Sequence, residues 1–189
     1  MQNIYNRVAA WNSKRYNRDY NKELTISLLR EEYEEWLNAS NDVEKLDALC
    51  DITYVALGAI WKLNPSEQEH NLAEVYSHDL VKNLLDINEF WPAYFTATLL
   101  DTYEYSNSDY PAINALTHIK SLVMMQALSM GLSFDDWCAA LLAVCDSNDS
   151  KSAVITASHI KANDKNKGML YFSPTAQLTK ILEKTNGRK

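Results

Sequence analysis

The chain has 189 residues and a net charge of −7, with 47% hydrophobic and 23% charged residues, which is enough for one domain with a substantial core. The negative charge and the lack of a strong basic stripe exclude duplex nucleic acid as an expected partner, and no apolar run reaches the roughly 18 residues that a membrane span needs. Only four glycines and four prolines disfavour a sheet with many tight turns, so the composition predicts an all-α fold.

Apolar residues recur at helical spacing along most of the chain. In chain order, the expected helices cover residues 2–12, 21–39, 42–63, 69–130 with breaks near 91–92 and 107–111, 134–146, and 175–184. The turn between the second and third helices is short, which predicts an antiparallel hairpin. Capping signals support these boundaries, because Asn41 precedes Glu44 by three residues, Ser66 precedes Glu69 by three, and Pro174 lies just before the last helix.

Acidic residues lie within faces of the two hairpin helices that are otherwise apolar. On a helical wheel, Glu32 falls inside the apolar face of residues 21–39, and Glu35 lies at its edge. In the next helix, a narrow strip with Asp47 and Asp51 interrupts an almost fully apolar surface. Buried carboxylates without compensation are costly, and basic residues are scarce here, so a hard divalent cation is their natural partner. The alternative is that these acids belong to an ordinary solvated, glutamate-rich helix surface.

Three blocks of the sequence carry a family resemblance. They are Glu31-Glu32-Tyr33-Glu34-Glu35 with the run from Asp47 to Gly58, then Gly131-Leu132-Ser133-Phe134-Asp135 with Ser147-Asn148-Asp149-Ser150-Lys151, and then Lys167-Gly168-Met169-Leu170-Tyr171-Phe172-Ser173-Pro174. In this order they resemble the all-α nucleoside triphosphate pyrophosphohydrolase superfamily, which includes MazG, the phosphoribosyl-ATP pyrophosphohydrolases and the MazG-like proteins of phages. Residues 65–130 have no counterpart in the short members, so we expect a helical insertion there within a single domain of residues 1–189.

The resemblance implies a MazG-like four-helix core, a C-terminal tail that contacts the substrate, and assembly as a homodimer or homotetramer. It also implies a bound Mg²⁺, for which Mn²⁺ can substitute, held by an ExxE pair and an acidic pair on the next helix. Carried over to this sequence, the metal ligands are Glu32, Glu35, Asp47 and Asp51, with Glu31 and Glu44 as alternates. The second pair has two registers, because Glu44 and Asp47 match the usual ExxD spacing, whereas the apolar run after Asp51 favours Asp47 with Asp51.

The implied reaction is Mg²⁺-dependent hydrolysis of a (d)NTP to (d)NMP and pyrophosphate, in control of the nucleotide pool. Glu32 or Glu35 would be the catalytic residue that activates the attacking water. The substrate-binding residues would be Asn148, Lys151 and Lys167 for the phosphates, and Tyr171 or Trp36 for the base. Three cysteines and no signal peptide place such a protein in the cytoplasm, that of the host if a phage encodes it. The alternative is a non-catalytic nucleotide-binding or helical interaction protein.

Overall fold

The structure, a computed structural model, describes residues 1–16, 18–84, 101–105, 108–151 and 170–187, and every regular element in these ranges is helical. The helices are α1 (Gln2–Ser13), α2 (Lys22–Asn38), α3 (Asp42–Leu63), α4 (Glu67–Leu84), α6 (Asp109–Ser129), α7 (Phe134–Ser150) and α8 (Thr175–Asn186). Residues 101–105 form one further helical segment. The all-α prediction is therefore confirmed for the described part of the chain.

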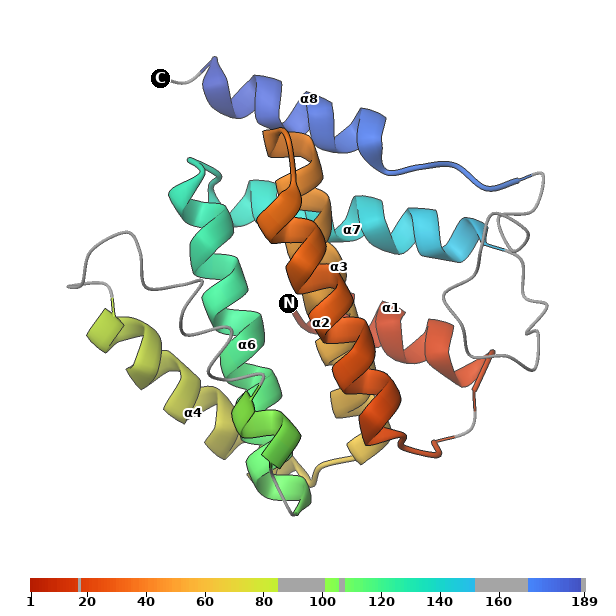
Figure 1. Cartoon of the computed structure of the whole chain (residues 1–189), viewed down its shortest axis with the longest axis vertical. Helices are drawn as coiled ribbons and strands as arrows, with labels where there is room; N and C mark the ends of the chain where they lie inside the picture. The colour runs from red at the N-terminus through yellow and green to blue at the C-terminus, as the bar shows by residue number, and fades with distance from the viewer. Residues whose placement is uncertain (17, 85–100, 106–107, 152–169, 188–189) are drawn as a thin grey trace.

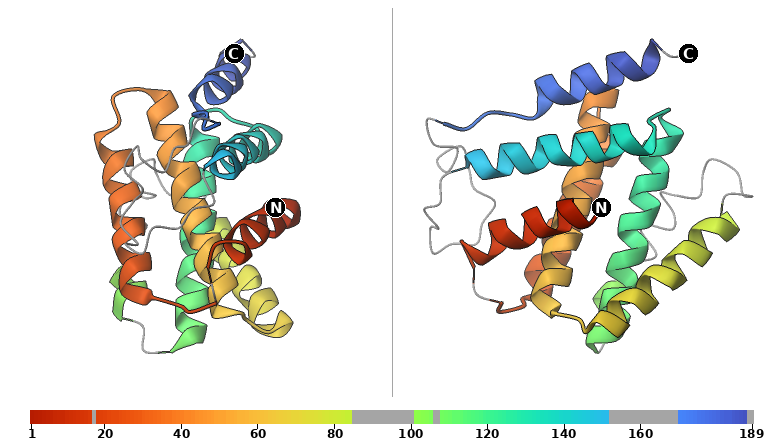
Figure 2. Two further views of the ribbon diagram at one scale, coloured as in Figure 1. Left: turned by 90° about the vertical axis from the view of Figure 1, so that its right-hand side faces the viewer. Right: turned by 180° about the vertical axis from the view of Figure 1, so that it is seen from behind.

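The central element is α3, around which the other helices are arranged (Figure 1). It packs against α1, α2, α6, α7 and α8, whereas α4 packs on α6. Twelve of its 22 residues are buried, in agreement with its nearly continuous apolar surface. The expected hairpin is confirmed, since α2 runs antiparallel to α3. Figure 2 shows α3 between α2 on one side and the layer of α1 and α7 on the other.

The ends of the hairpin helices follow the local signals in the sequence. Asn21 caps α2, because its side-chain oxygen accepts a hydrogen bond from the backbone N–H of Leu24 at 2.8 Å. Asn41 caps α3 in the same way, through the N–H of Glu44 at 3.0 Å. At the other end, Asn64 takes the left-handed conformation with φ of 51°, which asparagine tolerates and which stops the helix. These caps fix where the acidic residues fall along each helix.

The stretch expected as an insertion supplies part of the core. Leu116 and Ile119 of α6 are fully buried, and α6 packs along α3. That residues 65–130 are an insertion relative to shorter proteins stays a prediction. Within this fold, α6 is an integral part of the core. The expected break at 107–111 was too long, because α6 begins at Asp109. Pro111 lies in its first turn, where the missing N–H costs no helical hydrogen bond.

The end of α7 also differs from the prediction, since the helix continues beyond Asp146 to Ser150. The extra turn is rich in small polar residues, which locally favour a loop. Here their side chains have partners that leave the helix intact. Ser147 Oγ donates to the backbone oxygen of Phe172 at 2.9 Å, and Asn148 Nδ2 donates to the oxygen of Val144 at 3.0 Å. Tertiary contacts therefore extend the helix past its local stop signal.

A sharp turn joins α6 to α7. Gly131, with φ of 97°, supplies the backbone conformation that this turn requires. Ser133 then begins α7 with a reciprocal pair of hydrogen bonds to Asp136. Among the described helices, none is by itself long and apolar enough to cross a membrane, and α6 with α7 passes such a test only as a pair bent by 115°.

Candidate functional site

The hairpin brings three of the predicted acidic ligands within electrostatic range of one another. Glu32 on α2 is only 5% exposed, and Glu35, one turn later, is exposed. On α3, burial and the neighbouring charge of Glu32 raise the pKa of Asp47 from its usual 3.8 to about 6, and Glu35 adds to the rise. The ammonium group of Lys151 acts in the opposite direction. The carboxylates of two helices and a cation from the end of α7 therefore share one site.

The burial of Asp47 and its acidic neighbours give this carboxylate a need for a positive partner. Its Oδ1 atom is buried and accepts no hydrogen bond from any residue that the structure describes. At neutral pH its raised pKa still leaves the group mostly ionised, so a charge is held in a poorly solvated place. A hard divalent cation suits such an oxygen. In the described ranges, however, no three His, Cys, Asp or Glu side chains are already arranged to hold a metal ion. Like charges repel one another in this arrangement, and Lys151 offsets part of the repulsion.

Asp51 lies one turn after Asp47 on α3 and within electrostatic range of Cys145 on α7. Its charge adds to the rise in the pKa of the buried Cys50 thiol, which burial causes in the first place. It acts in the same direction on Cys145 of α7, whose pKa burial raises to about 11. Both thiols are therefore protonated at neutral pH. Asp51 and Asp47 share one face of α3, four residues apart, which is the register that the apolar run favours.

The alternate ligand Glu44 has a different role in this structure. Its side chain is exposed, and Oε2 accepts hydrogen bonds from the backbone N–H and the hydroxyl of Ser40, both at 2.8 Å. These bonds lower the pKa of Glu44. A carboxylate used in this way ties down the start of α3, so the geometry favours Asp47 with Asp51 over Glu44 with Asp47. Glu31, the other alternate, is half-buried on α2.

Of the predicted phosphate-binding residues, Lys151 at the C-terminal end of α7 lies within electrostatic range of Asp47. Lys151 Nζ donates to Asn148 Oδ1 at 2.7 Å, and Asn148 is buried. The tail is fixed to the same turn, because the backbone N–H of Phe172 donates to Ser150 Oγ at 3.2 Å. This contact places Tyr171, which is half-buried, next to the end of α7. Lys167 lies outside the described residues.

Trp36, the other candidate for stacking on a base, lies four residues after Glu32 on the same face of α2. Its ring packs against that of Tyr33, with centroids 5.7 Å apart and planes tilted by 41°. Trp36 is half-buried. It is therefore an aromatic surface close to the acidic residues, although its present contact is with its own helix.

Helix α1 and the residues just after it contribute contacts that the sequence pattern did not predict. Trp11 Nε1 donates to the backbone oxygen of Asn148 at 2.8 Å, and Arg15 Nη2 donates to the backbone oxygen of Lys151 at 3.1 Å. The Arg15 guanidinium also lies over the Trp11 ring, 4.4 Å from its centroid. The four-residue spacing of Trp11 and Arg15 is the one available sequence signal, and it does not reveal which helix they contact.

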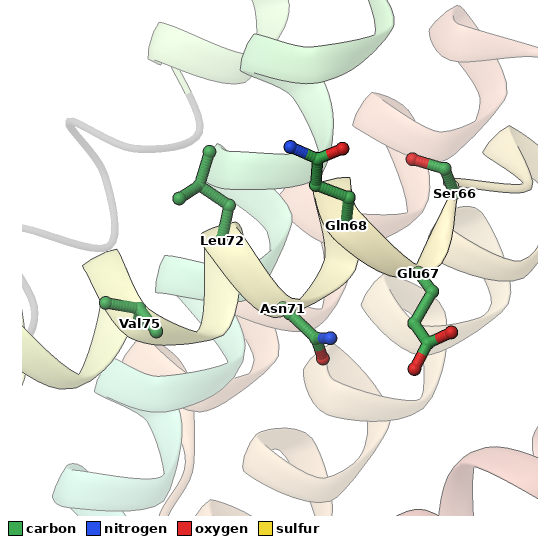
Figure 3. Close-up of a pocket in the computed structure, with 6 residues that line it drawn as sticks. All are labelled: Ser66, Glu67, Gln68, Asn71, Leu72 and Val75. Carbon is green, nitrogen blue, oxygen red and sulfur yellow. The ribbon is translucent and has the colours of Figure 1, made fainter.

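A separate surface hollow lies on α4 (Figure 3). Its lining residues are Ser66, Glu67, Gln68, Asn71, Leu72 and Val75. All six are exposed, and Leu72 and Val75 are the two large apolar side chains among them. None of the predicted site residues lines this hollow, so it is distinct from the acidic site between α2 and α3.

Comparison of the chain with protein-family models, with characterised proteins and with solved structures finds no match. The likeness to the pyrophosphohydrolases therefore rests on the three sequence blocks alone.

Proposed function

We propose that the protein is a MazG-like, Mg²⁺-dependent nucleoside triphosphate pyrophosphohydrolase that converts (d)NTP and water into (d)NMP and pyrophosphate. The observation that carries the proposal is the meeting of Glu32 and Glu35 from α2 with Asp47 from α3 beside Lys151. Clustered carboxylates suit a hard cation, and an adjacent lysine suits the phosphates that the cation accompanies. Neither half of this arrangement by itself would indicate a polyphosphate substrate.

The donor set of the site fits a divalent cation, because it consists of carboxylate oxygens and includes the buried, unpartnered Oδ1 of Asp47 in the described part of the chain. Glu32, Glu35, Asp47 and Asp51 would hold the ion. When bound, Mg²⁺ neutralises phosphate charge and makes a water molecule more acidic. The different exposure of Glu32 and Glu35 favours a different role for each of these residues of α2. Glu32 is buried and suited to a fixed ligand, whereas Glu35 is exposed and suited to accept a proton from water and release it to solvent.

The end of α7 would bind the phosphates. Lys151 now donates to Asn148 and would redirect its ammonium group to phosphate oxygens. Asn148 would keep its bond to Val144 through one amide hydrogen and have the second available for the substrate. Tyr171 or Trp36 would stack on the base. We further propose a homodimer or homotetramer that acts on the nucleotide pool of the cytoplasm, as the resemblance implies.

The test is product analysis with a panel of ribonucleoside and deoxynucleoside triphosphates in the presence of Mg²⁺ or Mn²⁺. We expect equimolar nucleoside monophosphate and pyrophosphate from at least one substrate, and no product in EDTA. Asp47→Asn and Glu35→Gln should each lower kcat/KM by about 100-fold or more. The matched control is Glu34→Gln, an exposed glutamate on the same helix, which should retain full activity.

Two outcomes would reject the proposal. One is the absence of hydrolysis across the whole panel with either metal, which would leave a nucleotide-binding or interaction protein. The other is full activity in both Asp47→Asn and Glu35→Gln, which would show that the reaction takes place elsewhere on the chain. Release of nucleoside diphosphate and phosphate would indicate a different bond specificity.

A further inference from the structure

Side chains at a spacing of four residues connect α1 and the residues after it to the last turn of α7. Arg7 pairs with Asp146 at 2.8 Å and with Asp149 at 2.5 Å. Four residues later, Trp11 donates to the oxygen of Asn148, and four residues after that, Arg15 donates to the oxygen of Lys151. Both helices end on the same side of the molecule, at the right of Figure 1. The chain after α1 therefore lies against the turn that carries the predicted phosphate-binding residues.

The same part of α1 lies along the acidic strip of α3. Tyr54 and Gly58 follow Asp51 by three and seven residues, so all three share one face of α3. The Trp11 ring meets Tyr54 edge-on, with centroids 5.8 Å apart and planes at 82°. At Gly58, an added Cβ would lie 3.2 Å from Asn12 Nδ2, so the glycine permits the close approach of α1. The end of α1 is thus adjacent to the acidic site on two sides, through α3 and through α7.

Arg15 has a hydrogen-bond donor and a positive charge that its contacts with the described residues do not use. Its Nε is buried and donates no hydrogen bond to any described residue. In the same ranges it forms no ion pair with a carboxylate, in contrast to Arg7, which has two aspartates. Stacking on Trp11 holds the plane of the guanidinium in place. A buried N–H without an acceptor is costly, and a fixed planar guanidinium matches the oxygens of a phosphate group.

We propose that Arg15 is a phosphate-binding residue of this site, which together with Lys151 binds the polyphosphate chain of the substrate. The identity of the substrate as a nucleoside triphosphate rests on the proposed function above. The chemistry that Arg15 recognises is the polyphosphate anion itself. In this arrangement Trp11 orients the guanidinium, and α1 becomes part of the active site.

A purely structural role for Arg15 is the competing explanation, because its bond to the Lys151 oxygen also caps the end of α7. Two substitutions separate these roles. Arg15→Gln retains a donor for that oxygen and loses the charge, whereas Arg15→Lys retains the charge and loses the planar fork. Lys14→Ala, which removes an exposed cation next in sequence, is the matched control for general charge effects.

The experiment measures KM and kcat for the preferred triphosphate, and the Kd of inorganic tripolyphosphate with Mg²⁺ by calorimetry. We expect Arg15→Gln to raise both KM and this Kd by about 10- to 100-fold, with a smaller rise in Arg15→Lys, while Lys14→Ala stays within twofold of the wild type. Thermal unfolding establishes that each variant is folded. If Arg15→Gln is folded and binds both ligands as the wild type does, the inference is wrong.

The two ligands separate this inference from the proposed function. A wild type that hydrolyses triphosphates, with Arg15 variants that do so equally well, would retain the function and reject the role of Arg15. A wild type that hydrolyses nothing but binds tripolyphosphate in a manner dependent on Arg15 would reject the function and retain the anion site. Loss of kcat with unchanged KM and unchanged tripolyphosphate Kd would also overturn the inference, because it would assign Arg15 to a positioning role.

Discussion

The acidic site should make the protein less stable when no cation is bound, and Asp47→Asn measures this cost. The substitution retains the size of the side chain and removes one of the clustered negative charges. Because the folded protein holds the proton of Asp47 more tightly than the unfolded chain does, the wild type loses stability as the pH rises from about 4 to about 6. Above pH 7 the wild type shows the full loss of stability from its ionised Asp47, and Asp47→Asn shows none of this loss.

The size of the effect follows from the pKa of Asp47. A rise from 3.8 to about 6 corresponds to roughly 3 kcal/mol, at about 1.4 kcal/mol per pH unit. Asp47 is partly exposed, so screening by water reduces this figure, and we expect a gain of about 1–2 kcal/mol in the free energy of unfolding. For a domain of this size, that gain corresponds to a rise of about 2–8 °C in Tm.

The assay is urea unfolding in EDTA at a series of pH values between 4.5 and 8. The advantage of Asp47→Asn should be greatest at pH 8 and should shrink as the pH falls through 6. Saturating Mg²⁺ should reverse the order, because the intact site gains binding free energy that the variant lacks. Glu34→Gln, on the exposed face of α2, should differ from the wild type by less than about 0.5 kcal/mol at every pH. An Asp47→Asn protein that is no more stable than the wild type at pH 8 in EDTA would refute this reasoning.

Two further outcomes test the site and the fold. Mg²⁺ binding should weaken as the pH falls below about 6, because the pKa of Asp47 near 6 means that a proton must leave before the cation binds. Calorimetry in buffers of different ionisation enthalpy should detect the release of that proton near pH 6. Mg²⁺ binding that does not change with pH would exclude Asp47 as a ligand. Leu116→Ala should lower the free energy of unfolding by about 2–4 kcal/mol in urea, since Leu116 is fully buried. The exposed Tyr105→Ala should change it by less than about 0.5 kcal/mol, and equal effects in the two variants would mean that α6 is not part of the core.

The acid-bearing hairpin could be predicted from the sequence because the information for it is local. Asn21 and Asn41 cap helices through atoms three residues away, and the apolar repeat fixes which face of each helix is buried. The same repeat placed Glu32 in the buried face of α2, and Glu32 is indeed 5% exposed. Where a few neighbouring residues determine the conformation, the capping residues and the apolar repeat were sufficient to predict it.

The last turn of α7 and the role of α1 could not be predicted in this way. Ser147 and Asn148 read as loop residues, because their side chains compete for backbone hydrogen bonds. They remain helical since Ser147 bonds to Phe172, 25 residues away, and Trp11 bonds to the backbone of Asn148. Arg15 meets Lys151 across 136 residues of sequence. Contacts of this range depend on how the helices pack, and no local spacing encodes them.

The most direct measurement of the central claim, that α2 and α3 together hold a divalent cation, is a titration with Mn²⁺ followed by electron paramagnetic resonance. We expect the wild type and Glu34→Gln to bind Mn²⁺ with the same affinity, and Mg²⁺ to displace it. Glu32→Gln and Asp47→Asn, with one change on each helix, should each weaken binding by at least about tenfold. Equal Mn²⁺ binding by all four proteins, or no binding by the wild type at millimolar Mn²⁺, would contradict the claim.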